Sequence, residues 1–235
     1  MMRLDKYLAH AGYGTRSEVK KIIQKGLVEV NGLVIKKDDQ KIDEVNDEII
    51  VAGEVSNYIK HVYLILHKPA GVISSNFDTT HKTTKDLIVG YEHYKTFPVG
   101  RLDLDTEGLL IITNDGLLAH QLLSPRYHVD KTYYVEFTGD YKSIYTALFE
   151  TGITLEDGYL CMPSRIELLN SQQALLTIKE GKYHQVKRMF LALDMEVTYL
   201  KRISFGPIQL DDTLKKGTFR PLSESEVEAL KKVVS

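Results

Sequence analysis

The chain lacks several residues and patterns on which whole classes of protein depend. Its 235 residues include no tryptophan and only one cysteine, Cys161. A single cysteine excludes both an intramolecular disulfide and a Cys-x-x-Cys metal site. The eight histidines never fall at His-x-x-x-His spacing. No apolar run resembles a signal-peptide core or reaches the roughly 20 residues that cross a bilayer. These absences predict a cytoplasmic protein with no metal ligands and no membrane partner.

An excess of charge of either sign is also missing. Thirty basic residues stand against 32 acidic ones, for a net charge of −2, which excludes a histone-like protein held to nucleic acid by bulk charge. Any contact with nucleic acid must therefore come from local patches. The chain also has no GxGxxG or GxxxxGK[ST] loop, so a nucleotide-binding doubly wound sheet is not expected.

A small N-terminal module is predicted by the spacing of its apolar and capping residues. Four apolar residues recur at the spacing of a helix, at Leu4, Tyr7, Leu8 and Ala11. Thr15 and Glu18 form a capping box for a second helix over residues 16–25. Asn31-Gly32 then lies between two alternating apolar runs, which is the strongest short-range signal for a β-hairpin.

Charge divides this module into two parts. Residues 1–37 hold eight basic and three acidic residues, a local net charge of +5, whereas residues 38–57 have a net charge of −6. The asymmetry indicates one face that contacts phosphates and another that is turned away from them. The polar stretch 53–60 has little pattern, and we expect it to be a linker.

The remainder of the chain predicts an α+β body. Strand-like apolar runs begin at Val62 and recur at 109–113, 132–137, 174–178 and 197–203. Helical patterns lie between them, at 117–123, 142–151, 185–193 and 224–233. The strands and helices are intermixed without regular βαβ alternation, which favours the α+β class.

Asp103 is the leading candidate for a catalytic group. It lies in GRLDLDTEGLLIITNDG, residues 100–116, where a turn crowded with charge runs into a buried strand. A side chain fixed at the mouth of a strand is held rigidly and can still reach a substrate beside it. A calcium loop is disfavoured because position 12 counted from Asp103 is Asn114, where an EF-hand needs a bidentate Glu.

A cluster of cations marks the start of the helix predicted near residue 185. Lys182, Lys187 and Arg188 gather there within EGKYHQVKRMF, residues 180–190. Cations at the positive end of a helix dipole repel one another unless an anion lies among them. The candidate anions are a phosphate backbone and the carboxylate of Asp103. His184 is either a general base or a hydrogen-bonding residue.

A third segment, SPRYHVDKTYYVEF at 124–137, combines aromatic and basic residues. Tyr133 and Tyr134 are neighbours on a predicted strand and point to opposite faces, so only one of them can face a cleft. Arg126 and Lys131 beside them indicate an edge that could face a nucleic-acid backbone.

Together these motifs resemble a known family. RLDKYLAHAGYGTRSEVKKIIQKGLVEVNG, residues 3–32, resembles the S4 RNA-binding domain. The body resembles the RsuA family of ribosomal RNA pseudouridine synthases in four segments, LHKPAG (66–71), PVGRLDLDTEGLLIITNDG (98–116), SPRYHVDKTY (124–133) and EGKYHQVKRMF (180–190). The resemblance implies an S4 domain over 1–57 and a catalytic domain over 58–235, built on a central mixed, mostly antiparallel β-sheet flanked by helices.

The resemblance also implies a reaction and its residues. A uridine in RNA loses its N1 glycosidic bond, turns while bound and rejoins the sugar through C5, with no redox change and therefore no cofactor. The family's catalytic residues map to Asp103, Tyr133 and Lys187. The base must first be flipped out of the RNA. Asp103 then either attacks C1′ or removes a sugar proton, and either Lys187 or its neighbour Arg188 pairs with it.

The implied partner is 16S ribosomal RNA or a small-subunit assembly intermediate, bound by a monomer. The predicted RNA contacts are basic or polar residues in both parts of the chain: Arg3, Arg16, Lys20, Lys21, Lys68, Arg101, Arg126, Lys131, Lys182, His184, Gln185 and Arg188. Thr106 and the complete SPRYH segment favour the 16S enzyme over the RluB type, which acts on 23S RNA. A non-catalytic S4-domain protein of ribosome assembly is a third hypothesis.

Overall fold

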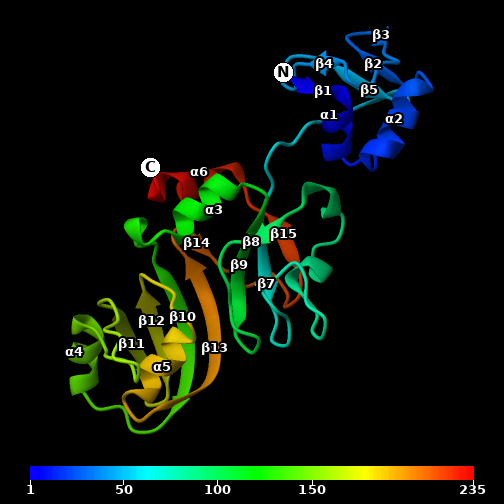
Figure 1. Cartoon of the computed structure of the whole chain (residues 1–235). Helices are drawn as coiled ribbons and strands as arrows, with labels where there is room; N and C mark the ends of the chain where they lie inside the picture. The colour runs from blue at the N-terminus through cyan, green and yellow to red at the C-terminus, as the bar shows by residue number, and fades with distance from the viewer. The chain divides into compact units, whose positions relative to one another are not determined.

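The computed structural model describes residues 1–235, which divide into two compact units (Figure 1). The N-terminal unit comprises Met1–Val62 and Val89–Thr96, and the larger unit comprises Tyr63–Ile88 and Phe97–Ser235. The chain therefore returns to the N-terminal unit after its first strand in the larger one. The domain boundary predicted after residue 57 precedes the division at Val62.

The N-terminal unit extends past residue 57 because aromatic side chains pack on it. Tyr58 stacks on Tyr7 with ring centroids 5.0 Å apart, and Tyr94 meets His10 edge-on at 5.3 Å. The prediction that 53–60 is a linker is wrong, since Glu54–Val55 forms strand β6 and pairs with its neighbour β5. A two-residue strand is too short to show the alternation that identifies strands in a sequence.

Two short helices and a small sheet make up this unit. The helices are α1 (Leu4–His10) and α2 (Arg16–Gln24). The strands are β1 (Met2–Arg3), β2 (Val28–Val30), β3 (Leu33–Val34), β4 (Lys41–Ile42), β5 (Ile49–Val51) and β6 (Glu54–Val55). The sheet order is β3-β2-β5-β6, and β1 pairs separately with β4. Leu4, Leu8, Val19 and Ile23 are completely buried, so both helices cover the core with their apolar faces.

The local signals at both turns are confirmed. Thr15 Oγ1 accepts a hydrogen bond from the Glu18 backbone at 3.4 Å, and the Glu18 carboxylate accepts one from the Thr15 backbone at 2.7 Å. This is the capping box of α2. Asn31 and Gly32 have φ angles of 51° and 77° and join β2 to β3, as a type I′ hairpin requires.

The larger unit is built on a nine-stranded sheet of order β11-β12-β10-β13-β9-β7-β15, with β14 beside β13 and β8 beside β9. The strands are β7 (Tyr63–Lys68), β8 (Phe97–Pro98), β9 (Glu107–Thr113), β10 (Lys131–Thr138), β11 (Arg165–Asn170), β12 (Gln173–Ile178), β13 (Glu196–Phe205), β14 (Ile208–Gln209) and β15 (Phe219–Pro221). Every pair is antiparallel except β9 with β13. The mixed, mostly antiparallel sheet is confirmed.

Helices cover this sheet in two groups. The elements are α3 (Gly116–Leu123), α4 (Ile144–Thr151), α5 (Gln185–Leu191) and α6 (Glu224–Val233), with 3₁₀ turns η1 (Thr84–Leu87), η2 (Glu92–Tyr94, in the N-terminal unit) and η3 (Pro125–Tyr127). Phe190 of α5 packs on Phe137 of β10 and Phe149 of α4, with ring centroids 5.0 and 5.6 Å apart. Helices α3 and α6 lie side by side near β14 (Figure 1). None of the helices has the length and apolar character needed to cross a bilayer.

The parallel junction of β9 and β13 depends on a glycine. Gly108 lies opposite Arg202 in the register, and its φ of 108° is one that only glycine adopts easily. A Cβ at this position would lie 2.6 Å from the Arg202 backbone nitrogen and 2.9 Å from its carbonyl carbon. The two halves of the sheet can therefore meet only because position 108 has no side chain.

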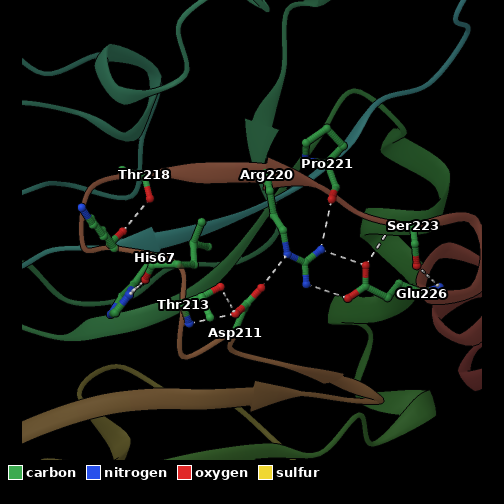
Figure 2. Close-up of polar contacts among 10 residues, drawn as sticks. His67, Asp211, Thr213, Thr218, Arg220, Pro221, Ser223 and Glu226 are labelled. Carbon is green, nitrogen blue, oxygen red and sulfur yellow. Dashed lines mark hydrogen bonds and ion pairs between the residues drawn. The ribbon is translucent and has the colours of Figure 1, made fainter.

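Arg220 anchors the C-terminal helix to the edge of the sheet (Figure 2). From β15 its guanidinium donates to both carboxylate oxygens of Glu226 at 2.9 Å and to Asp211 at 3.3 Å. Glu226 also accepts a hydrogen bond from the Ser223 backbone at 2.7 Å, which is part of the capping box of α6. On the neighbouring strand β7, His67 Nδ1 lies 2.8 Å from the Leu214 carbonyl.

Candidate active site

Asp103 lies in a loop whose backbone is pinned from two sides. Strand β9 begins only at Glu107, so the carboxylate precedes the strand rather than starting it. Ser74 Oγ accepts a hydrogen bond from the Leu102 backbone and donates one to its carbonyl, both at 2.9 Å. The Gly71 backbone donates to the carbonyl of Leu104 at 2.8 Å. These contacts fix the backbone on both sides of Asp103.

Lys68 supplies the remaining support of this loop from inside the protein. Its side chain is completely buried, and its ammonium donates to the carbonyls of Thr106 at 2.8 Å, Asp103 at 3.0 Å and Pro69 at 3.1 Å, with Leu104 at 3.4 Å. Burial lowers the pKa of Lys68 to about 8, against the opposing effect of Asp103 and other nearby carboxylates. The prediction that Lys68 contacts RNA is wrong, because no part of it reaches the surface.

A small polar hollow of about 60 Å³ opens beside Asp103. Its walls include six of the residues that the sequence singled out: Arg101, Asp103, Tyr133, Lys182, His184 and Gln185. Tyr133 comes from β10 and is only 7% exposed. Its neighbour Tyr134 points to the other face of the sheet, where its hydroxyl donates to Glu136 at 2.7 Å. The prediction that one tyrosine of this pair faces the cleft is confirmed.

His184 is the basic side chain that lies beside the Asp103 carboxylate. Its Nε2 lies 3.7 Å from Asp103 Oδ1, a distance that allows an ion pair with the imidazolium but exceeds a hydrogen bond. The residue caps α5 in the left-handed conformation, with φ 48°. Its ring stacks on Tyr183 at a centroid distance of 3.8 Å, and Tyr183 is 76% exposed.

The cations at the start of α5 bind carboxylates other than Asp103. Lys187 Nζ lies 2.6 Å from Asp105, which lowers the pKa of that carboxyl. Arg188 pairs with Glu156 at 2.7 Å and with Asp157 at 2.6 Å. The expectation that Lys187 or Arg188 pairs with Asp103 is therefore wrong for this structure. The sequence identified the need for an anion but not which one, since Asp105 is far from Lys187 along the chain.

Comparison with known proteins identifies the family. Residues 62–192 match the RNA pseudouridylate synthase family and residues 2–49 match the S4 domain. The chain belongs to the pseudouridine synthase family. It is therefore an isomerase that acts on RNA, with an S4 domain ahead of a synthase domain.

Relatives match over the whole chain. The RNA pseudouridine synthase YtzG of Bacillus subtilis is 44% identical, over 97% of this chain and 98% of its own. The ribosomal small subunit pseudouridine synthase A of Haemophilus influenzae is 38% identical, over 98% and 100%. A crystal structure of a pseudouridylate synthase superposes with a TM-score of 0.69 at 38% identity, over 98% of this chain and 100% of that one.

The predicted RNA contacts of the synthase differ in how accessible they are. Gln185 is buried and holds its own loop, because it accepts from the Lys182 backbone at 2.9 Å and donates to Glu180 at 2.8 Å. Arg3 pairs with Asp5, and Lys20 pairs with Asp38, both at 3.0 Å. The contacts that are exposed and have no ion pair are Arg16, Lys21, Arg101, Arg126 and Lys182.

Arg202 is a buried cation that the sequence reasoning missed. It is 2% exposed, its Nε donates to the Leu109 carbonyl at 2.8 Å, and its Nη2 has no hydrogen-bond partner. The signal was present in the alternation along β13, which places Arg202 on the buried face with Leu200 and Ser204.

Replacing Lys68 with Met tests whether the lysine positions Asp103. Without the ammonium, the carbonyls of the Asp103 loop lose their shared donor, and a shift of the carboxylate by an ångström lowers kcat by about 10²-fold. We expect the Kd for RNA to stay within about two-fold, since the residue is enclosed. Single-turnover kinetics with filter binding separate the two quantities. A Lys68→Met enzyme with normal kcat and weakened RNA binding would show that Lys68 contacts RNA.

Proposed function

We propose that this synthase converts a specific uridine of 16S ribosomal RNA to pseudouridine, with Asp103 as the reacting carboxylate. The observation that carries the proposal is that Asp103, on a loop fixed by buried hydrogen bonds, and Tyr133, on strand β10, line one polar hollow. Support for the RNA target comes from relatives named ribosomal small subunit pseudouridine synthase A in Haemophilus influenzae, Pasteurella multocida and Vibrio cholerae, at 38–39% identity over nearly the whole chain.

The chemistry assigns a role to each proposed residue. The target base leaves the RNA stack and enters the hollow, because a stacked uridine hides its sugar carbon. Asp103 then attacks C1′ or removes a sugar proton, and both routes break the N1 bond and permit the uracil to turn. Tyr133 stacks on the uracil beside the C5 hydrogen that leaves at the end. We assign Lys187 the role of a cation that exchanges Asp105 for an RNA phosphate once the substrate is bound.

In this proposal, basic side chains of the S4 domain make the first contacts with RNA. Arg16 and Lys21 lie on α2 and are exposed without an ion pair, whereas Lys20 on the same helix is compensated by Asp38. Contacts to phosphates orient the RNA without reading its sequence.

We place the S4 domain at residues 1–57 and the catalytic domain at 58–235. We propose that the protein is a cytoplasmic monomer that needs no cofactor.

Changing both free cations, Arg16→Gln with Lys21→Gln, should weaken binding of 16S RNA. The dependence of log Kd on log salt should become shallower by about one unit for each lost phosphate contact. Lys20→Gln is the matched control and should have a smaller effect, because Asp38 already neutralises that lysine. Titrations at several salt concentrations measure the slopes. If the slope of log Kd against log salt were unchanged in the double variant, α2 would not contact RNA phosphates.

The proposed target is tested with RNA labelled with tritium at C5 of uridine. The purified enzyme is incubated with 16S RNA, 23S RNA and a small-subunit assembly intermediate, and tritium release reports loss of the C5 hydrogen. We expect one equivalent from 16S RNA or from the intermediate and none from 23S RNA. Release from 23S RNA alone would identify a large-subunit enzyme of the RluB type. Binding without release from any RNA would favour the non-catalytic assembly protein.

A further inference from the structure

A second cavity, of about 260 Å³, adjoins the Asp103 hollow in the synthase domain. Gly181 and Lys182 line both, so a single stretch of backbone separates them. Lysines and an aromatic ring face the cavity, together with one acid: Lys131, Lys179, Lys182, Tyr159 and Glu180. None of these residues has a role in the chemistry proposed for Asp103.

The three lysines of this cavity have no carboxylate partner. Salt bridges occupy the neighbouring Lys187, Arg188 and Lys216, but none involves Lys131, Lys179 or Lys182. The only acid in the wall, Glu180, already accepts hydrogen bonds from the Tyr159 hydroxyl, the Met162 backbone and Gln185, at 2.6 to 2.8 Å. The cavity therefore carries a net positive charge, because Glu180 offsets only one of its three lysines.

Lys131 shows that this charge lies inside the domain. It is 8% exposed, and its ammonium donates to the Val129 carbonyl at 2.8 Å and lies 5.3 Å from the centre of the Phe205 ring. A buried cation without an ion pair is unfavourable, and burial, with a smaller effect of Arg202, lowers the pKa of Lys131 to about 8 against the opposing effect of Asp130 and Glu180. Lys68, in contrast, is surrounded by four carbonyl acceptors. An anion that entered the cavity would supply the partner that Lys131 lacks.

The aromatic wall suggests what accompanies the anion. The Tyr159 ring lies against Lys182, whose ammonium is 4.7 Å from the ring centre. A planar aromatic group next to cations is the arrangement that binds a nucleobase together with its phosphate. A nucleotide bonded to the target uridine must lie beside the target, and this cavity shares two wall residues with the Asp103 hollow.

We propose that this cavity binds the nucleotide adjacent to the target uridine, with its phosphate at Lys131 and Lys182 and its base against Tyr159. The inference rests on the proposed function and deepens it. It makes the cavity a subsite that selects the sequence or conformation next to the target. Contacts to a splayed base can carry sequence information, whereas contacts to phosphates alone cannot.

The experiment tests whether a change in the cavity and removal of the adjacent base have non-additive effects on kcat/KM. Short RNAs that contain the target uridine are made intact or with an abasic site on its 5′ or its 3′ side. We expect one abasic RNA to lower kcat/KM of the wild-type enzyme by about ten-fold, the scale of a lost base stack. Tyr159→Ala should lower kcat/KM on intact RNA by a similar factor and should show no further loss with that abasic RNA. Tyr159→Phe, which keeps the ring, should retain the penalty.

The phosphate is tested in the same way. A neutral methylphosphonate replaces the linkage of the adjacent nucleotide, and Lys182→Met removes an exposed cation of the cavity. The two changes should be non-additive. The control is Lys142→Met, since Lys142 also lies over a tyrosine ring, that of Tyr145 at 5.7 Å, but outside the cavity. Its penalty from the methylphosphonate should equal that of wild type.

Additive losses for every pair of enzyme and RNA changes would overturn the subsite. This outcome is distinguishable from failure of the proposed function, because wild-type turnover of intact RNA is measured in the same series. If the wild type does not act on intact RNA, the proposed function fails. If it does act and no coupling is found, only the subsite fails.

Discussion

Asp103→Asn is expected to abolish pseudouridine formation. The amide keeps the size of the carboxylate and its place in the pinned loop, but it neither attacks a sugar carbon nor accepts a sugar proton. Loss of the reacting group from a site of this kind lowers turnover by about 10⁴-fold or more. RNA binding should stay within about two-fold, because phosphate contacts dominate affinity. Tritium release in single-turnover conditions, together with filter binding, measures both effects.

Asp105→Asn is the matched control for this variant. Asp105 lies two residues further along the same loop, but its side chain is 70% exposed and its role in the structure is to pair with Lys187. An exposed ion pair contributes little to stability, so we expect turnover to fall by less than about ten-fold. If Asp105→Asn were as inactive as Asp103→Asn, the reacting carboxylate would have to be reassigned.

Gly108→Ala is expected to have the largest effect on stability. Its Cβ would lie 2.6 Å from the Arg202 backbone nitrogen, and alanine resists a φ of 108°. Relief of this clash requires β9 and β13 to separate, which breaks the one parallel pair that joins the two halves of the sheet. We expect the free energy of unfolding to fall by about 4 kcal/mol or more, as measured by denaturant titration followed by circular dichroism.

The control for this change is Gly116→Ala. Gly116 is the first residue of α3, and a Cβ there meets no atom within 4 Å. The free energy of unfolding should change by less than about 1 kcal/mol and in the stabilising direction, because alanine is the better helix former. A Gly108→Ala protein that unfolds at the same denaturant concentration as wild type would contradict the close approach of β9 and β13.

The sequence predicted the parts of the fold whose signals are local. The capping box at Thr15, the hairpin at Asn31-Gly32 and the alternation along β10 are each contained in a few consecutive residues. These patterns report backbone geometry directly, so tertiary contacts did not change them. The same holds for the prediction that only one of Tyr133 and Tyr134 faces the hollow, whereas the choice of Tyr133 came from the family resemblance.

The contacts that build the site are long-range and were not predictable in this way. The partner of Lys187 is Asp105 rather than Asp103, and Lys68 is enclosed by the loop it holds instead of facing RNA. Each error follows from the fact that a basic residue in a motif has the same appearance whether it contacts substrate or supports the backbone. Burial separates the two roles, and burial at position 68 depends on how strand β7 packs against the loop before β9.

The most direct test of the central claim is chemical mapping of pseudouridine in ribosomal RNA from cells with the gene, without it, and with only the Asp103→Asn form. We predict one pseudouridine in 16S RNA that disappears when the gene is deleted, returns with the wild-type gene and does not return with Asp103→Asn. A pattern of 16S pseudouridines that is identical in all three strains would contradict the assignment of both the substrate and the reacting carboxylate.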